Sequence, residues 1–165
     1  MAIVSIEEFK QKLNGTSRLL ALDIGTKTIG VAFGAILTGT VSPLKVINRK
    51  KMAIDAAQLK DYMDQYSCEG LVVGWPLNVD GTEGPRCQGV RDVMLELLKH
   101  IPDVPVVFFD ERFSTHKAEK FMIEEVDYSR AKRGQIVDKM AAQVILQEFL
   151  ELEMGISHID QGGYR

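Results

Sequence analysis

Five short apolar runs, three near the start of the chain and two further on, stand out in the hydrophobic pattern. They cover residues 18–24, 28–34, 41–48, 70–75 and 104–109. Apolar runs of this length between turn residues predict β-strands. The first three are joined by short connections, which predicts an antiparallel meander. Pro43 marks the third strand as an edge strand, because proline cannot donate to a sheet ladder.

Apolar residues return at helical spacing between and after the later strands. The spacing predicts helices over 52–66, from Pro85 to about residue 98, and over 136–152 after a loop through Gly134. We expect a further helix over 114–125. Ser5 and Glu8 form a capping box, which predicts a peripheral helix within residues 1–17. The polar, glycine-rich residues 155–165 are expected to form a flexible tail.

This order of elements predicts one α/β domain over residues 1–165, with its core at about 18–152. The predicted sheet is mixed and five-stranded, an antiparallel meander continued by two parallel strands, and helices flank it. That arrangement is the ribonuclease H-like fold. It puts Asp23 midway across the sheet. It puts Asp110 and Glu111 at the carboxyl end of a strand, where open α/β sheets usually bind their ligands.

Three acidic positions stand where the pattern predicts burial. Asp23 ends the first apolar run, Glu111 follows the last run beside Asp110, and Asp138 lies on the inward stripe of the final helix. A buried carboxylate is costly unless it is compensated, and several together repel one another. A divalent metal between them is the simplest explanation. The structural alternatives are a turn cap for Asp23, a helix-dipole partner for Asp138 and an ion pair for Glu111.

Composition and charge narrow the class of protein. The 165 residues, 45% hydrophobic and 26% charged, are typical of a globular domain, and no apolar run approaches a membrane span. The N-terminus is not leader-like, and the two cysteines and three histidines are isolated, so we expect a cytoplasmic protein without disulfides or zinc. The net charge of −3 and pI near 5.6 argue against non-specific coating of nucleic acid. Locally, residues 49–51 form a basic cluster.

Four motifs, taken in order, resemble the YqgF family, whose RuvX-like members are described as pre-16S rRNA nucleases and Holliday junction resolvases. The motifs are LDIGTKTIGVA (22–32), VGWPLNVDGTEGP (73–85), DERFST (110–115) and VDKMAAQVILQ (137–147). Together they span the chain from about Arg18 to Leu152. The sequence departs from the family at Thr28, where members often carry arginine, and at Trp75, where leucine is commoner.

The resemblance implies a metal-dependent endonuclease that hydrolyses phosphodiester bonds in maturation of the 5′ end of the 16S ribosomal RNA precursor. The implied catalytic and metal-binding acids are Asp23, Glu111 and Asp138, with Asp110 open as an alternative to Glu111. Oxygen ligands without histidine suit two Mg²⁺ or Mn²⁺ ions, which activate a water and stabilise the leaving oxygen. Candidates for holding phosphates or sugars are predicted mainly on loops: Lys27, Asn78, Thr82, Arg86, Arg112, Thr115, Arg130, Lys132 and Arg133.

Two other classes of function stay open. Residues 23–26 also resemble the phosphate loop of actin-like ATPases and sugar kinases, although the chain is too short for the two halves of those proteins. A non-catalytic RNA- or transcription-factor-binding module is the second alternative. Nor does the sequence separate precursor rRNA, free or in ribosome assembly intermediates, from branched DNA as the nucleic-acid partner. Monomer and homodimer both fit, although junction resolvases act as dimers.

Overall fold

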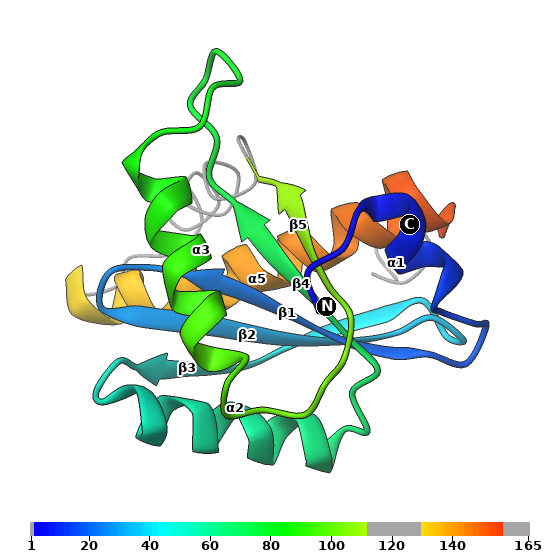
Figure 1. Ribbon diagram of the computed structural model, residues 1–165, viewed down its shortest axis with the longest axis horizontal. Helices are drawn as coiled ribbons and strands as arrows, with labels where there is room; N and C mark the ends of the chain where they lie inside the picture. The colour runs from blue at the N-terminus through cyan, green and yellow to red at the C-terminus, as the bar shows by residue number, and fades with distance from the viewer. Residues whose placement is uncertain (1, 112–129, 157–165) are drawn as a thin grey trace.

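The structure, a computed structural model, describes residues 2–111 and 130–156, with side chains described through 111 and again from 140. Figure 1 shows a single sheet with helices on both faces. The elements are α1 (Ile6–Gln11), β1 (Arg18–Ile24), β2 (Thr28–Ala35), β3 (Thr40–Asn48), α2 (Met52–Gln65), β4 (Gly70–Trp75), α3 (Pro85–Leu97), β5 (Val106–Asp110) and α5 (Arg130–Met154). The helix expected over 114–125 lies outside the described residues.

The sheet has the order β3-β2-β1-β4-β5, with β1 at its centre. β1 to β3 pair antiparallel, and β4 pairs parallel with both β1 and β5. This confirms the predicted meander continued by two parallel strands, and with it the ribonuclease H-like arrangement. Pro43 lies on the edge strand β3, as expected, and the β2–β3 register shifts beside it, where Ala32 pairs with Pro43 and Val31 with Lys45.

Alternation along the strands divides the core into two layers. Leu20 and Leu22 of β1 face α2 and α3, whereas Leu19 and Ala21 face α5. Figure 1 shows α5 crossing one face of the sheet and α2 and α3 lying on the other. α5 packs closely, because a Cβ at Gly34 would come within 2.7 Å of Leu146 Cδ2. A functional side chain on the sheet therefore belongs either to the α5 face or to the α2/α3 face.

The final helix begins earlier than predicted. α5 starts at Arg130 and runs for 25 residues, so the loop expected through Gly134 is wrong, and Arg130, Lys132 and Arg133 lie in the helix. Alanine, lysine and arginine favour helix, and the cost of Gly134, about 1 kcal/mol relative to alanine, is small beside the packing of so long a helix. None of the described helices combines the length and the hydrophobicity that a membrane span requires.

The N-terminal residues cover the β5 edge of the sheet. Val4 N donates to Val106 O at 2.8 Å, and Val106 N donates to Ala2 O at 2.6 Å. Ser5 caps α1 by accepting from Glu8 N at 3.2 Å, as the capping box predicted. The helix was expected to be peripheral, yet its Phe9 is fully buried. This segment therefore closes an exposed strand edge and contributes to the core.

Candidate active site

Asp23 and Glu111 come together on the α5 face of the sheet. Alternation puts Asp23 on the same side of β1 as Ala21, and puts Glu111, the residue after β5, on the same side as Phe109. The two carboxyl groups lie close enough for Asp23 to raise the pKa of Glu111. Their closeness disfavours ionisation of both carboxyl groups at once in the absence of a cation.

Gly74 makes this approach possible. β4 lies between β1 and β5, so Glu111 has to reach across β4 toward Asp23. A Cβ at Gly74 would lie 2.8 Å from Glu111 Cδ and 2.7 Å from Ile145 Cδ1. Both distances are shorter than carbon atoms tolerate. The missing side chain at position 74 thus leaves the space that the Glu111 carboxyl group occupies.

The environment of Glu111 disfavours its charge. Glu111 is 7% exposed, and its Oε2 has no hydrogen-bond partner among the described residues. Burial, with a smaller contribution from the neighbouring charge of Asp23, raises the pKa of Glu111 to about 8, while Arg86 acts in the opposite direction. A buried, unpaired carboxyl oxygen beside a second carboxyl group is a position where a cation would relieve both burial and repulsion.

Asp110 occupies a different environment from Glu111. It is exposed, and it pairs in register with Trp75 of β4. Its place on β5 alternates with that of Phe109, so it belongs to the side opposite the carboxyl pair. The structure thus brings Glu111, the acid favoured by the family resemblance, next to Asp23. Which of the two acids contributes to activity stays a prediction.

Asp138 lies within α5, seven residues before Ile145, a separation of about two helical turns. Ile145 is fully buried and lies beside Gly74, so this helix passes directly under the carboxyl pair. The side chain of Asp138 is outside the described residues. No three metal-binding side chains cluster among those that are described. Asp138 as the third acid therefore stays a prediction.

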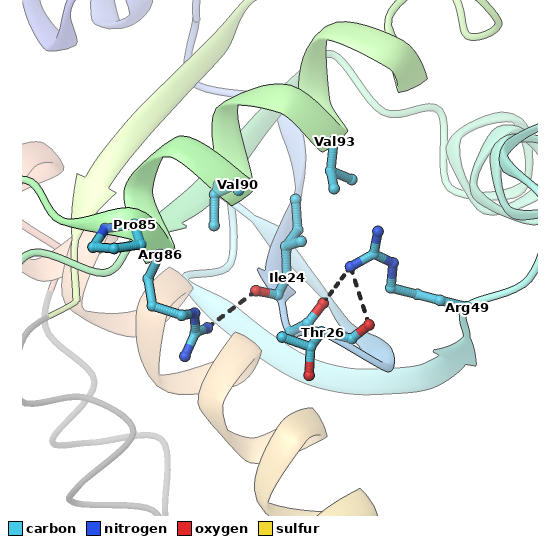
Figure 2. Close-up of a pocket in the computed structure, with 9 residues that line it drawn as sticks. Ile24, Thr26, Arg49, Pro85, Arg86, Val90 and Val93 are labelled. Carbon is cyan, nitrogen blue, oxygen red and sulfur yellow. Dashed lines mark hydrogen bonds between the residues drawn. The ribbon is translucent and has the colours of Figure 1, made fainter.

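Arg86 lies between the carboxyl pair and the neighbouring turn. Pro85 begins α3, as its position after the loop predicted, and Arg86 follows it. One guanidinium nitrogen of Arg86 donates a long hydrogen bond of 3.4 Å to Ile24 O, at the end of β1 (Figure 2). Its positive charge also lowers the pKa of Glu111. This is a suitable position for a phosphate-binding arginine, the role that its sequence position suggested.

Arg49 is a residue that the sequence did not single out as part of a site. Its Nη1 donates to Gly25 O at 2.7 Å and to Thr26 O at 3.3 Å, so it holds the β1–β2 turn (Figure 2). The buried Asp55 carboxylate accepts from Lys50 N at 3.0 and 3.1 Å and fixes the backbone beside it. The signal was available in the pattern, because an antiparallel meander returns the end of its third strand to the turn between the first two.

Asn78 and Thr82 brace the loop between β4 and α3. Asn78 Nδ2 donates to Thr82 Oγ1 at 2.9 Å, and Thr82 Oγ1 donates to Asp80 Oδ1 at 2.6 Å. Asn78 also lies against Gly84, where a Cβ would come within 3.1 Å of its side-chain amide. These contacts give both residues a structural role in the loop. Contact of either residue with nucleic acid stays a prediction.

The remaining predicted phosphate-binding residues fall into three groups. Lys27 is exposed on the β1–β2 turn, near Arg49, whose backbone N donates to Lys27 O at 2.9 Å. Arg112 and Thr115 lie outside the described residues. The third group lies in α5 rather than in a loop, and it consists of Arg130, Lys132 and Arg133. Their side chains are outside the described residues.

Comparison with known proteins identifies the family to which this chain is similar. The family model described as "RuvX: Holliday junction resolvase" matches residues 17–152. A "Putative pre-16S rRNA nuclease" of Caulobacter vibrioides (strain NA1000 / CB15N) is 43% identical over 156 residues, which cover 94% of this chain and 100% of that protein. A protein of the same name from Ruegeria pomeroyi is 42% identical over 151 residues, covering 92% of this chain and 97% of that protein.

A solved structure is also similar to this chain. "T. thermophilus RuvC in complex with Holliday junction substrate" matches with a TM-score of 0.48 and 13% identity, over 85% of this chain and 97% of that chain.

Proposed function

Because the chain belongs to the RuvX Holliday junction resolvase family, a family of nucleases, we propose that it is a metal-dependent endonuclease that acts on precursor 16S ribosomal RNA. The observation that carries this proposal is the Asp23–Glu111 pair, two carboxyl groups close together at the end of the central strands, with one buried oxygen that has no partner in the described part of the chain. An RNA-binding module without activity would have no need of such a costly pair. The actin-like kinase alternative also lacks support from the family match.

The residues at the site fit a divalent cation. Glu111 Oε2, which has no hydrogen-bond partner among the residues that the structure describes, and the Asp23 carboxylate offer the oxygen donors that Mg²⁺ and Mn²⁺ prefer. Asp138 is the proposed third ligand. When bound, the metal supplies an activated water and stabilisation of the leaving oxygen. Glu111 must release its proton to bind the metal, and Arg86, whose charge favours the ionised form, assists that release.

RNA is the favoured substrate, because the similar proteins from Caulobacter and Ruegeria are named for precursor 16S rRNA. That substrate implies a cytoplasmic enzyme that meets precursor rRNA free or in ribosome assembly intermediates. Junction DNA is the second candidate, supported by the description of the family model. The proposed phosphate contacts are Arg86 and Lys27 near the carboxyl pair. Arg112, Thr115 and the basic residues of the first turns of α5 are further candidates.

A comparison of substrates tests the proposal. The purified protein is incubated with a 5′-extended 16S rRNA fragment and with a four-way DNA junction, in Mg²⁺, Mn²⁺ or chelator. We expect metal-dependent cleavage of the RNA and slower or no cleavage of the junction. Faster cleavage of the junction would favour the second candidate. Cleavage of neither substrate in either metal would contradict the nuclease assignment.

A further inference from the structure

A cavity of about 240 Å³ lies at the carboxyl end of β1, between the β1–β2 turn and the start of α3. Its wall is apolar and rigid, because Ile24, Val90 and Val93 are core residues with 9% exposure or less. Figure 2 shows Arg49 and Arg86 on its two sides. We call this cavity the arginine pocket. It is lined principally by Ile24, Thr26, Arg49, Arg86, Val90 and Val93.

Both arginines are oriented by backbone carbonyls and keep donors for a ligand. Arg49 holds the carbonyl groups of the β1–β2 turn through one guanidinium nitrogen, and Arg86 reaches the Ile24 carbonyl through one. A guanidinium has several further N–H donors. Neither arginine forms a salt bridge with a carboxylate of the described residues. The pocket therefore has a positive rim on a chain whose net charge is −3, which favours an anionic ligand.

The shape and lining of the pocket narrow the ligand further. A bare phosphate needs only hydrogen-bond donors and gains nothing from contact with an apolar wall. A volume of about 240 Å³ is below the roughly 300–1,000 Å³ of pockets for drug-sized molecules, so it suits one ring system. An apolar slot between two guanidinium groups thus matches a single nucleotide, with its base in the slot and its phosphates on the arginines. A base inside a duplex cannot enter such a pocket unless it leaves the stack.

We propose that the arginine pocket holds the base of one unpaired nucleotide of the substrate strand, next to the phosphate that is cleaved, with Arg49 and Arg86 on the flanking phosphates. The pocket lies on the α2/α3 face of the sheet, opposite the acids, and Arg86 connects the two at the end of β1, since it donates to Ile24 O and its charge also acts on Glu111. This inference rests on the proposed nuclease function and adds that the enzyme needs an unpaired nucleotide at its cleavage site. The wall is aliphatic, so the identity of that base matters little.

Gly89 offers a way to fill the pocket without changing its charge. It lines the cavity, and a Cβ placed on it meets nothing within 4 Å, so Gly89→Leu adds a side chain without a clash at its first carbon. Gln88→Leu is the matched control, because this neighbouring residue of α3 is exposed and is not part of the lining. Both variants are made in an Asp23→Asn background, in which RNA can bind without being cut.

The test is a scan with single-stranded RNA oligonucleotides, each carrying one abasic position. With the pocket intact, one position should weaken binding about fivefold to tenfold, the lower part of the range for the loss of one base contact. With Gly89→Leu, the intact oligonucleotide should bind as weakly as that abasic one, and the abasic scan should become flat. Gln88→Leu should behave like the background. A flat scan with the pocket intact, or the same position-specific loss in Gly89→Leu, would overturn the proposal.

A second variant tests the charge at the rim. Arg49→Gln keeps a hydrogen-bond donor for the turn but removes the charge, and Lys45→Gln removes an exposed charge from β3 as a control. Arg49→Gln should reduce the slope of log affinity against log salt by about one, and Lys45→Gln should leave it unchanged. Equal slopes for both variants would contradict a phosphate contact at Arg49. If wild-type protein cleaves RNA while both tests fail, the pocket proposal fails and the nuclease assignment stands.

Discussion

Replacing Gly74 by alanine should separate activity from folding. The new methyl would lie 2.8 Å from Glu111 Cδ and 2.7 Å from Ile145 Cδ1, so the carboxyl group, the helix or both must move. Overpacking costs about 1–3 kcal/mol, and the lower backbone entropy of alanine in the unfolded chain returns about 0.5–1 kcal/mol. We expect a net loss of about 1–2 kcal/mol, which lowers the melting temperature by about 3–6 °C in a domain of this size.

The effect on catalysis should be larger than the effect on stability. Displacing Glu111 by about 1 Å is enough to cost on the order of 100-fold in rate. The assay is single-turnover cleavage of the 5′-extended RNA in Mg²⁺, paired with thermal unfolding and with calorimetric titration of Mn²⁺. Gly15→Ala is the control, because a Cβ there meets nothing within 4 Å. That control should keep the rate, the melting temperature and the Mn²⁺ affinity of wild type.

A second substitution distinguishes displacement of Glu111 from general disruption. Ile145→Val removes the Cδ1 atom that the methyl at position 74 would meet, so the double variant Gly74→Ala/Ile145→Val should regain stability relative to Gly74→Ala. It should stay inactive, because the clash with Glu111 remains. A wild-type rate in Gly74→Ala, or recovery of activity together with stability in the double variant, would refute the reasoning.

Three further predictions concern the acids and the basic residues of α5. In chelator, the contribution of Glu111 to the free energy of unfolding should fall as the pH rises from 4.5 to about 8. The reason is that the folded-state pKa of Glu111, about 8, exceeds its ordinary value of 4.5, so the folded protein holds more protons than the unfolded chain in that range. Urea unfolding across this range should show a shallower fall for Glu111→Gln than for wild type, and an equal fall would contradict the assignment. Glu111→Gln should reduce cleavage about 100-fold or more and Asp110→Asn less than tenfold, and the reverse order in initial rates would exchange their roles. Arg130, Lys132 and Arg133 are changed together to alanine. The slope of log RNA affinity against log salt should fall by about one per lost phosphate contact, and Mn²⁺ affinity should not change. An unchanged slope would show that these residues make no phosphate contact.

Much of the fold follows from the apolar pattern. The runs at 18–24 and 70–75 coincide with β1 and β4, because strands buried on both faces carry continuous apolar sequence between turns. Pro43 identified the edge strand correctly. The predicted start of α5 was wrong. Gly134 was interpreted as part of a loop, although a long helix tolerates a single glycine.

The site was only partly predictable, since local sequence does not show which side chains meet. The sequence predicted both Asp23 and Glu111 to be costly buried acids; the structure brings them together, with Glu111 buried and Asp23 half-buried. The role of Gly74 could not be predicted without knowing that β4 lies between β1 and β5 and that Ile145 packs against Gly74. Arg49 was noted only as part of a basic run, although the predicted meander already returns the end of β3 to the first turn, where Arg49 contacts Gly25.

The Asp23→Asn variant offers the most direct test of the central claim that this carboxylate pair holds a catalytic metal. The measurement is the single-turnover rate of cleavage of the 5′-extended 16S rRNA fragment at saturating Mg²⁺, for wild type, Asp23→Asn and Asp61→Asn, an exposed acid on α2. The account predicts that Asp23→Asn folds normally and loses at least about 100-fold in rate, comparable with the effect of removing a catalytic group, while Asp61→Asn cleaves like wild type. Cleavage by a folded Asp23→Asn protein at the wild-type rate would contradict it.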